Sequence, residues 1–190
     1  CNKFHPCQSL ADMMTIKERF DGYNVNLLYV GVHNNVLNSL METLPVLGGH
    51  LYTLTPIMND PSKDERVNEL ANRTGRLHIV DPEISFKELK SLIKDMNVVY
   101  TDSWIDMEFF HAETYRKTKE ERIKIMSPYQ LNDELLDETN AIVMHDMPMH
   151  CGYEISREII EKNIDVIMQQ SENRRHAQNG VLVSLLNCDI

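Results

Sequence analysis

Short apolar segments alternate with amphipathic, helix-like segments along almost the whole chain, and this alternation restricts the fold more than any other feature. The apolar segments are rich in Val, Ile, Leu and Tyr, and Gly, Pro, Asn or Asp bound most of them, which is typical of strands. We expect strands at residues 25–30, 50–55, 77–80, 98–101, 141–144 and 165–169. Near-continuous apolar runs favour parallel strands that are buried on both faces.

The segments between these runs carry apolar residues at helical spacing. We expect helices at residues 9–20, 35–47, 64–72, 85–94, 153–162 and 171–186. In the fourth of these, Ser85 and Glu88 have the spacing of a capping box. The order predicts an α/β fold, a doubly wound and mainly parallel sheet with helices on both faces, of Rossmann-like type. Such folds bind ligands at the carboxyl ends of their strands.

Composition narrows the classes of function that need attention. The 190 residues fit one domain. A formal net charge of −10 argues against non-specific binding to nucleic acid, and no apolar run approaches the roughly 18 residues of a membrane span. Cys1, Cys7, Cys151 and Cys188 lack the spacing of a zinc site. Together with the absence of a secretory signal, the scattered cysteines and 11 methionines favour the cytoplasm. A chain that begins at Cys1 and not at Met suggests an incomplete product.

Residues 110–132 interrupt the alternation with a highly charged segment. A solvated helix or a surface excursion is the usual meaning of such a charge run. A mobile loop over an active site is the alternative, because long excursions in compact domains often act as lids.

Polar residues follow three of the expected strands. Asn35 comes after the first strand, where it could also cap the next helix, and no Gly-x-Gly-x-x-Gly fingerprint accompanies it, so a dinucleotide site is poorly supported. Asp102 follows the fourth strand, either as a ligand group or as the cap of a turn. His145 and Asp146 follow the fifth, where they fit acid–base chemistry or a hydrogen-bonded hinge. His150 lies nearby, but a metal site is disfavoured because the ligand spacing of a helix-borne site is missing.

Both ends of the chain offer further candidates. Arg174 is expected near the start of the last helix, where a guanidinium and free backbone N–H groups would bind an anion; an ordinary exposed helix charge is the alternative. His5 and Gln8 precede the first expected helix. The two side chains could bind a carbonyl or phosphate group. A turn followed by a helix cap is the alternative interpretation.

In combination, these motifs resemble one family. His5-Pro-x-Gln8, the following Leu-Ala-Asp, Asn34-Asn35, Asp102-Ser-Trp, His145-x-x-Pro and Glu-Asn-Arg174 occur in the order and strand positions of the ornithine/aspartate carbamoyltransferases. The resemblance extends from His5 to about residue 186. It covers the carboxyl-terminal, amine-binding domain of that family, and it is closer to the ornithine branch than to the aspartate branch.

The resemblance implies a role for each site residue. His5 and Gln8 would contact the carbonyl and amino end of carbamoyl phosphate, which Arg174 would also face. Asn35 and Asp102 would bind the amino-acid part of the acceptor. Four further residues match positions that lie beside the attacking amine of the substrate in this family: Asp106, Met107, Asp146 and Met147.

Three departures accompany the resemblance. The amino-terminal domain of the family, which carries the Ser-Thr-Arg-Thr phosphate loop, lies outside this chain. Asp106-Met107-Glu108 replaces the Ser-Met-Gly of ornithine enzymes, and Asp146 replaces the cysteine that usually precedes leucine. Because both positions neighbour the substrate amine, the acceptor could differ from ornithine. The alternatives are acetylated or succinylated ornithine, putrescine and aspartate.

The resemblance implies a transferase of arginine metabolism that makes citrulline or an analogue. It would need no metal and no organic cofactor, and the intact enzyme would be a homotrimer joined mainly through its amino-terminal domain. The chain alone is expected to be inactive. The competing hypothesis is a non-catalytic Rossmann-like module that binds an amino acid or a protein partner.

Overall fold

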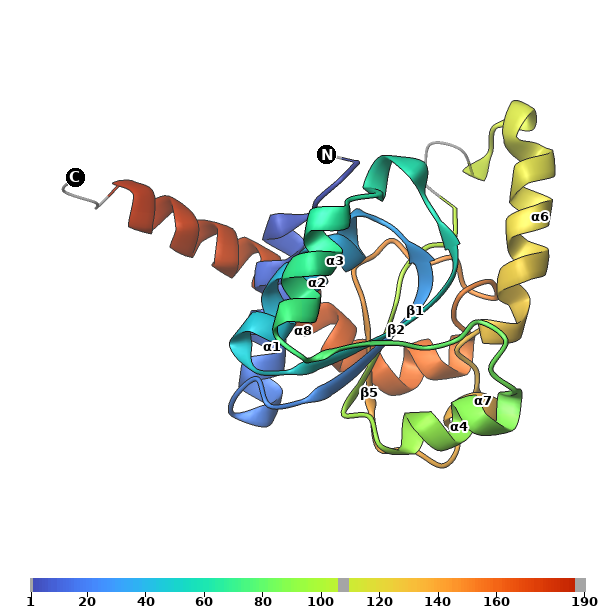
Figure 1. Cartoon of the computed structure of the whole chain (residues 1–190), viewed down its shortest axis with the longest axis horizontal. Coiled ribbons are helices and arrows are strands. Elements are labelled where there is room, and N and C mark those ends of the chain that lie inside the picture. Colours follow the sequence, from blue (N-terminus) through green and yellow to red (C-terminus); the bar gives the residue numbers. More distant parts are fainter. Residues whose placement is uncertain (1, 106–109, 187–190) are drawn as a thin grey trace.

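The computed structural model describes residues 2–105 and 110–186, and within them five parallel strands form one sheet (Figure 1). The strand order is β3-β2-β1-β4-β5. Their bounds are β1 (Asn26–His33), β2 (His50–Met58), β3 (Leu77–Ile79), β4 (Val98–Thr101) and β5 (Ile142–His145). The predicted α/β, doubly wound architecture is confirmed, and all four strand pairings are parallel.

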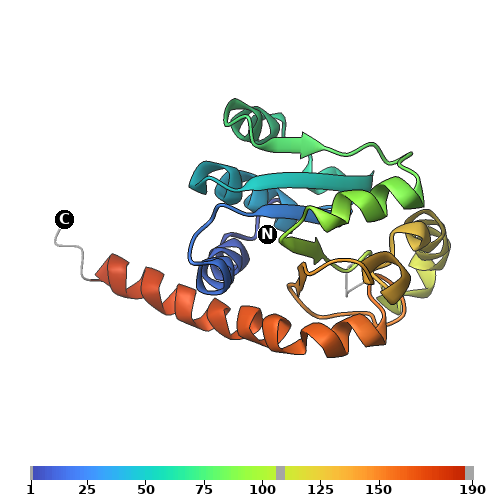
Figure 2. The same cartoon turned by 90° about the horizontal axis from the view of Figure 1, so that it is seen from below.

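Helices cover both faces of this sheet (Figures 1 and 2). The α-helices are α1 (Pro6–Phe20), α2 (Asn35–Leu47), α3 (Glu65–Arg73), α4 (Phe86–Lys94), α6 (Arg116–Met126), α7 (Asp133–Leu136) and α8 (Arg157–Leu186). Short 3-10 turns are η1 (Asp60–Ser62), η2 (Glu113–Tyr115) and η3 (Ser127–Tyr129). The capping box of Ser85 and Glu88 is formed, as its spacing predicts.

The central strand β1 is buried on both sides. Leu27 and Tyr29 pack into one core with α1, α2 and α3, whereas Leu28 and Val30 pack into a second core with α4, α7 and the start of α8. Alternate side chains of a strand point to opposite faces, so a continuous apolar run fills both cores at once. This packing explains why β1 shows no polar alternation in the sequence.

One predicted strand is wrong. Residues 165–169 lie within α8, which runs without interruption from Arg157 to Leu186. Its buried residues Val166, Ile167, Gln170 and Asn173 recur at helical spacing, and Gly or Pro does not interrupt them. The short apolar run was therefore one face of a long helix. The helix predicted at residues 171–186 is part of α8, and so are residues 157–162 of the helix predicted at residues 153–162, whereas residues 153–156 precede α8.

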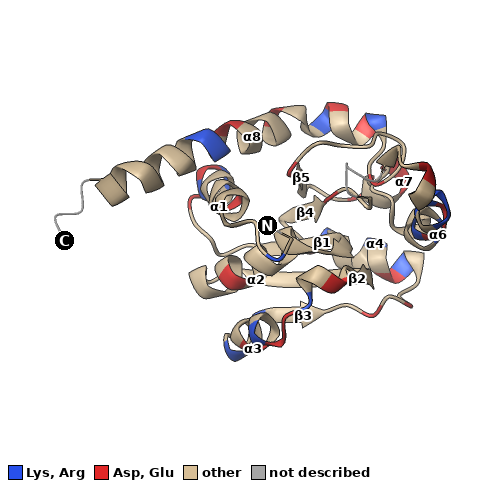
Figure 3. Cartoon of the chain, turned by 90° about the horizontal axis from the view of Figure 1, so that it is seen from above, with Lys and Arg blue, Asp and Glu red and all other residues tan. Residues whose placement is uncertain are grey.

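The charged segment at residues 110–132 contains a solvated helix, which confirms the first of its two interpretations. Both basic and acidic residues occur along α6 (Figure 3). Arg122 attaches this helix to the body by donating to the Trp104 carbonyl at 3.2 Å and to Asn59 Oδ1 at 2.7 Å. Whether the segment moves over a ligand stays a prediction.

The carboxyl-terminal end of α8 projects beyond the rest of the fold (Figure 2). This end carries exposed apolar side chains: Val181, Leu182, Val183, Leu185 and Leu186. Among the described residues, no helix combines the length and the apolar character needed to cross a membrane.

We expect Leu40→Ala to lower the free energy of unfolding by about 2–5 kcal/mol, because Leu40 is fully buried in the first core and truncation leaves a cavity. Urea unfolding followed by circular dichroism measures the loss. Leu47→Ala is the matched control on the same helix, since Leu47 is 45% exposed, and it should change stability by about 0.5 kcal/mol or less. Equal losses in the two variants would contradict this packing.

Candidate functional site

The strand order reverses between β1 and β4, and a cavity of about 170 Å³ lies at the carboxyl ends of these strands. Parallel α/β sheets bind ligands at such a reversal, because the chains leaving the two strands turn to opposite faces and leave a crevice. The cavity is lined by His5, Asn34, Asn35, Val36, Asp102, Ser103, Asp146, Met147 and Pro148. Segments from four distant parts of the chain thus meet at one edge of the sheet.

The turn after β1 is organised by Asn34. Its side-chain oxygen accepts hydrogen bonds from the backbone N–H groups of Val36 and Leu37, so Asn34, and not Asn35, is the N-cap of α2. The Asn34 amide nitrogen donates to Asp102 Oδ2, and the backbone N–H of Ser103 donates to Asp102 Oδ1. The cap that starts α2 therefore also orients the carboxylate that follows β4.

Asp146 places a second carboxyl group against Asp102. Its side chain is 9% exposed, and its Oδ1 atom is buried without a hydrogen-bond partner. The pKa of Asp146 lies well above its ordinary value, because burial disfavours the charged form and because the negative Asp102 faces it. Two close carboxyl groups in a dry site cannot both ionise easily, so the site holds protons more tightly than free aspartate does.

His145 holds the turn that carries Asp146 and Met147. The backbone N–H of Met147 donates to His145 Nδ1 at 3.0 Å, so Nε2 carries the proton and points to Glu154 Oε1 at 3.3 Å. Met147 has a φ of +60°, a conformation that non-glycine residues seldom adopt. The buried pair of Glu154 and His145 thus supports a strained turn at the edge of the cavity.

One group of described residues has the geometry of a metal site. Potential ligand atoms of Asp102, His145 and Asp146 all lie within 4.8 Å of one another. However, both ring nitrogens of His145 already take part in hydrogen bonds. A metal ion that used His145 as a ligand would have to displace one of these two hydrogen bonds. The three residues are therefore a poor set of metal ligands.

Arg174 supplies positive charge beside His5. His5 is half-buried, and its pKa is lowered first by that burial and then by the positive charge of Arg174, while Asp102 opposes the shift. The predicted location of Arg174 at a helix N-terminus is wrong, because α8 begins at Arg157. The helix nevertheless brings Arg174 close enough to influence His5.

Gln8 is not one of the residues that line the cavity. Its side chain is buried, and Nε2 donates to Asp12 Oδ1 at 2.9 Å. The same carboxyl group accepts from Gln170 Nε2 at 2.7 Å and from the Tyr100 hydroxyl at 3.3 Å. Complete burial raises the pKa of Asp12 to about 7, although these hydrogen bonds oppose the shift. A direct contact between Gln8 and substrate stays a prediction.

The predicted site residues therefore divide into three groups. His5, Asn35, Asp102, Asp146 and Met147 line one cavity, as their strand-end positions predict. Arg174 and Gln8 do not line this cavity: Arg174 influences the charge of His5, and Gln8 donates to Asp12. Asp106 and Met107 lie outside the described residues.

Sequence reasoning missed three contributors. Asn34 and Ser103 each stand next to a predicted site residue. The choice between Asn34 and Asn35 as the helix cap depends on where α2 starts, which varies by a residue or two in any prediction. Asp12 gave a clearer signal, because an acidic residue between Ala11 and Met13 on the buried face of a helix needs partners.

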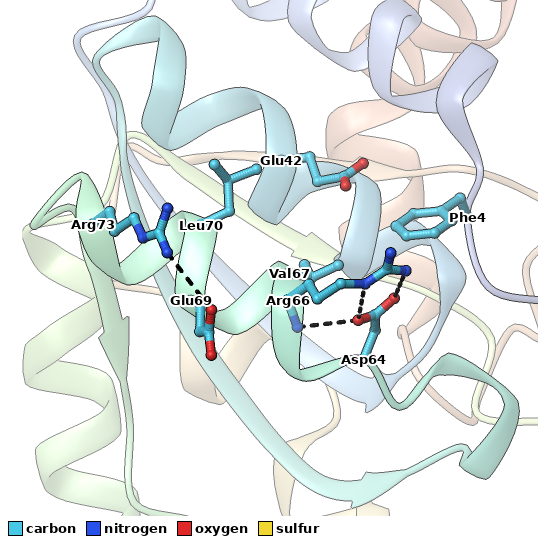
Figure 4. A pocket seen from close by; sticks show the side chains of 8 residues that line it. All are labelled: Phe4, Glu42, Asp64, Arg66, Val67, Glu69, Leu70 and Arg73. Atoms are coloured by element: carbon cyan, nitrogen blue, oxygen red, sulfur yellow. Dashed lines mark hydrogen bonds and ion pairs between the residues drawn. The ribbon is translucent and has the colours of Figure 1, made fainter.

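A larger cavity of about 460 Å³ lies elsewhere, on the outer side of α2 and α3 (Figure 4). Its charged groups are largely paired with one another. Asp64 accepts from Arg66 and pairs with Lys3 at 2.9 Å, and Arg73 pairs with Glu69 at 3.7 Å. These ion pairs hold the pKa of Asp64 below its ordinary value. With its charges already balanced and no strand end beside it, this cavity is a weaker candidate than the one at the strand reversal.

Taken together, the fold and the site define a doubly wound α/β domain with a cavity lined by two carboxyl groups at the reversal point of its sheet. Residues 23–185 match the family model described as "Aspartate/ornithine carbamoyltransferase, Asp/Orn binding domain". The chain belongs to this family.

Individual relatives agree with the family match. The chain is 37% identical over 191 residues to an ornithine carbamoyltransferase from Nostoc, covering 97% of this chain and 58% of that protein. It is also 37% identical to the enzyme of that name from Archaeoglobus fulgidus, covering 97% of this chain and 57% of the relative. The chain thus spans less than two thirds of the length of the curated relatives it matches.

Solved structures show the same relation in three dimensions. The ornithine carbamoyltransferase from Pyrococcus furiosus superposes with a TM-score of 0.78 at 34% identity, covering 95% of this chain and 56% of that one. The anabolic ornithine carbamoyltransferase from Campylobacter jejuni gives a TM-score of 0.79 at 28% identity, covering 98% and 60%.

The raised pKa of Asp12 predicts a pH dependence of stability. Between its ordinary value of 3.8 and about 7, the folded state holds a proton that the unfolded state releases. The contribution of Asp12 to the free energy of unfolding therefore falls as pH rises through this range, by up to about 1.4 kcal/mol per pH unit.

Asp12→Asn should remove this slope, because asparagine does not titrate. Unfolding in urea at pH 4, 5, 6 and 7 gives the difference between wild type and variant, and that difference should shrink or reverse as pH rises. Parallel pH profiles for the two proteins would show that Asp12 does not hold the proton.

Proposed function

We propose that this chain is the amine-binding half of a carbamoyltransferase, which transfers a carbamoyl group from carbamoyl phosphate to the amine of ornithine or a related compound. The observation that carries the proposal is the cavity at the strand reversal, where His5, Asp102 and Asp146 meet in a member of the carbamoyltransferase family. The relatives from Nostoc, Archaeoglobus fulgidus and Pyrococcus furiosus are named ornithine carbamoyltransferases, which supports ornithine as the first acceptor to test.

The proposed reaction begins with attack of a neutral amine on the carbonyl carbon of carbamoyl phosphate. A new C–N bond forms, the C–O bond to phosphate breaks, and the proton that the amine loses passes to the departing phosphate. His5 would donate an N–H to the carbonyl oxygen while negative charge develops there. Its lowered pKa suits this role, because a neutral imidazole still carries one N–H.

Arg174 would stabilise the departing phosphate. A guanidinium forms charge-assisted and often bidentate hydrogen bonds with phosphate oxygens. Arg174 is half-buried beside His5, so its charge is screened less by water than that of a fully exposed arginine. The same charge would draw carbamoyl phosphate toward a site that is otherwise acidic.

We further propose that residues 1–190 form the carboxyl-terminal domain of a two-domain enzyme, and that an amino-terminal domain supplies the rest of the phosphate site. The relatives' greater length supports this arrangement. The projecting end of α8 supports it as well, since exposed Leu182, Leu185 and Leu186 would be stabilised by a covering surface.

We propose a homotrimer for the intact enzyme, assembled through the amino-terminal domain, and a cytoplasmic location. Among the described cysteines, Cys7 and Cys151 are both unpaired, as expected in a reducing compartment. Sedimentation of the chain, alone and with the amino-terminal domain, tests the assembly.

Carbamoyl transfer should require both domains. The chain combined with a carbamoyl-phosphate-binding amino-terminal domain should release phosphate and form a carbamoylated amine, whereas the chain alone should form little or none. Mass spectrometry measures the carbamoylated products that the two-domain protein and the chain alone form from ornithine, acetylornithine, putrescine and aspartate. No product from any amine with both domains present would favour a non-catalytic binding module.

Arg174→Ala should reduce the rate of the two-domain enzyme by about 10²-fold or more, because removing a group that stabilises transition-state charge has an effect of this size. Steady-state phosphate release is the measurement. Arg175→Ala is the matched control, since Arg175 is the exposed neighbour on the same helix and forms an ion pair with Glu172 at 3.0 Å. Equal rates in the two variants would remove Arg174 from the site.

A further inference from the structure

Two histidines meet at the edge of the sheet, away from the cavity at the strand reversal. His50 begins β2, and His78 is the middle residue of β3, which is the edge strand beside β2 (Figure 3). His50 Nδ1 and His78 Nε2 lie 3.0 Å apart, and Arg76 Nη1 lies 3.2 Å from His50 Nε2. All three side chains are partly buried. The proposed reaction uses none of them.

Arg76 fixes the positions of the protons on both rings. A guanidinium can only donate hydrogen bonds, so His50 Nε2 must accept and carries no proton. The proton of the neutral His50 ring is therefore on Nδ1, which donates to His78 Nε2. Because His78 Nε2 accepts this hydrogen bond, the proton of the His78 ring is on Nδ1. Both imidazoles are thus neutral, and both carry their proton on Nδ1.

Neither ring can take up another proton without losing a hydrogen bond. A proton on His50 Nε2 would remove the acceptor of Arg76 and would place two cations 3.2 Å apart. A proton on His78 Nε2 would remove the acceptor of His50. An unperturbed imidazole gains a proton near pH 6.5, so mild acid should break this pair of hydrogen bonds.

The immediate surroundings of His78 favour the neutral ring. The pKa of His78 lies below its ordinary value, first because burial disfavours the charged form and then because His50 is close. Tyr52 opposes this shift, since it stacks on His78 with the ring centroids 4.4 Å apart and an aromatic face attracts a cation. The lowered pKa indicates that burial outweighs this attraction.

Other charged groups around this face of the sheet bind elsewhere. Helix α4 packs on the same face, where Tyr52 joins its core. Lys87 and Asp95 of this helix are exposed. The remaining charged groups of α4, and the aspartate that follows β3, have other partners: Glu88 with Ser85, Lys90 with Asp137, Lys94 with Glu138, and Asp81 with the backbone N–H of Glu83. Within the described residues, Arg76 is therefore the charged group in contact with the two rings.

Arg76 also connects the two rings to the backbone. Its Nη1 donates to the Gly48 carbonyl at the end of α2, at 2.8 Å, and its own carbonyl accepts from the Leu51 N–H in β2, at 2.9 Å. Strand β3 has only three residues, and in the described sheet it pairs on one side alone. A strand with so few backbone hydrogen bonds opens locally when side-chain bonds to its neighbour are lost.

We propose that Arg76, His50 and His78 form an acid-released latch, which fastens β3 to β2 at neutral pH and opens when either imidazole takes up a proton. The latch needs no ligand, and it is independent of the proposed function. A metal ion fits the two facing nitrogens poorly. Its binding at His50 Nδ1 would force the ring proton onto Nε2, where Arg76 donates.

The direction of the pH effect follows from proton uptake. The open state binds a proton that the latched state excludes, so the equilibrium constant for opening β3 increases as the pH falls below about 6.5. The increase is up to about tenfold per pH unit for each proton. This dependence is opposite in sign to that of Asp12, whose contribution to stability falls as pH rises.

Hydrogen exchange of single amides, followed by NMR from pH 7.5 to pH 5, measures the opening. The Val80 N–H donates to the Thr53 carbonyl at 2.9 Å and reports on the end of β3, while the amides of the central strand β1 are the internal reference. After correction for the intrinsic pH dependence of exchange, protection of Val80 relative to β1 should fall about fivefold or more. A ratio that stays constant would overturn the latch.

Variants assign the effect to the two rings. His78→Gln keeps an acceptor opposite His50 Nδ1 but does not titrate, so protection of Val80 should lose much of its dependence on pH. His176→Gln is the matched control, a histidine on α8 whose side chain is 47% exposed, and should behave as wild type does. Circular dichroism confirms that each variant is folded. An unchanged pH dependence in His78→Gln would assign the effect to another group and reject the latch.

A second measurement needs no variant. Long-range proton–nitrogen NMR spectra distinguish the two nitrogens of each histidine ring. At pH 7.5, both His50 and His78 should carry their proton on Nδ1, because Arg76 imposes this form on the first ring and the first ring imposes it on the second. A proton on Nε2 of either ring would contradict the hydrogen bonds from which the latch is inferred.

Discussion

The parallel pairing of β1 with β4 is the constraint on which the site depends. Because the sheet continues to β2 and β3 on one side and to β5 on the other, the chain leaves these two central strands in opposite directions. The cavity lies where the two paths separate. Asn34 joins them, since it caps α2 and donates to Asp102. The fold and the site therefore share one hydrogen-bonded connection.

Burial then determines the chemistry of the acidic residues. Asp12 and Asp146 are both removed from water, and the pKa of each is raised by that desolvation. The two differ in their partners. Asp12 accepts hydrogen bonds from Gln8, Gln170 and Tyr100 and so connects α1, α8 and β4. Asp146 keeps an unsatisfied oxygen beside the cavity. A satisfied buried acid stabilises structure, whereas an unsatisfied one at a cavity is available to a ligand.

Membership of the carbamoyltransferase family and the departures from its pattern are consistent with one another. The fold, the strand-end motifs and the match to the amine-binding domain agree. The replacement at Asp146 falls in the lining of the cavity and not in the two cores. Variation at such positions changes what a site binds without changing the fold that presents it.

Much of this architecture was accessible from the sequence. Apolar runs with strand-like composition located five strands, and the capping box at Ser85 located the start of α4. The strand-end rule placed Asp102 and Asp146 at one edge. Residues 165–169 were assigned wrongly, because a short apolar run is common to a buried strand and to one face of a helix. Only packing against α1 and β5 distinguishes the two.

The sequence by itself determined the class of fold, the order of its elements and the types of side chain at the strand ends, because these follow from local hydrophobic periodicity and turn chemistry. The tertiary structure decided which of those side chains touch. The contact of Asp102 with Asp146, the burial of Gln8 on Asp12 and the approach of Arg174 to His5 join residues that are far apart in the chain. Contacts of this kind depend on how helices settle on the sheet, and that depends on the packing of the whole core.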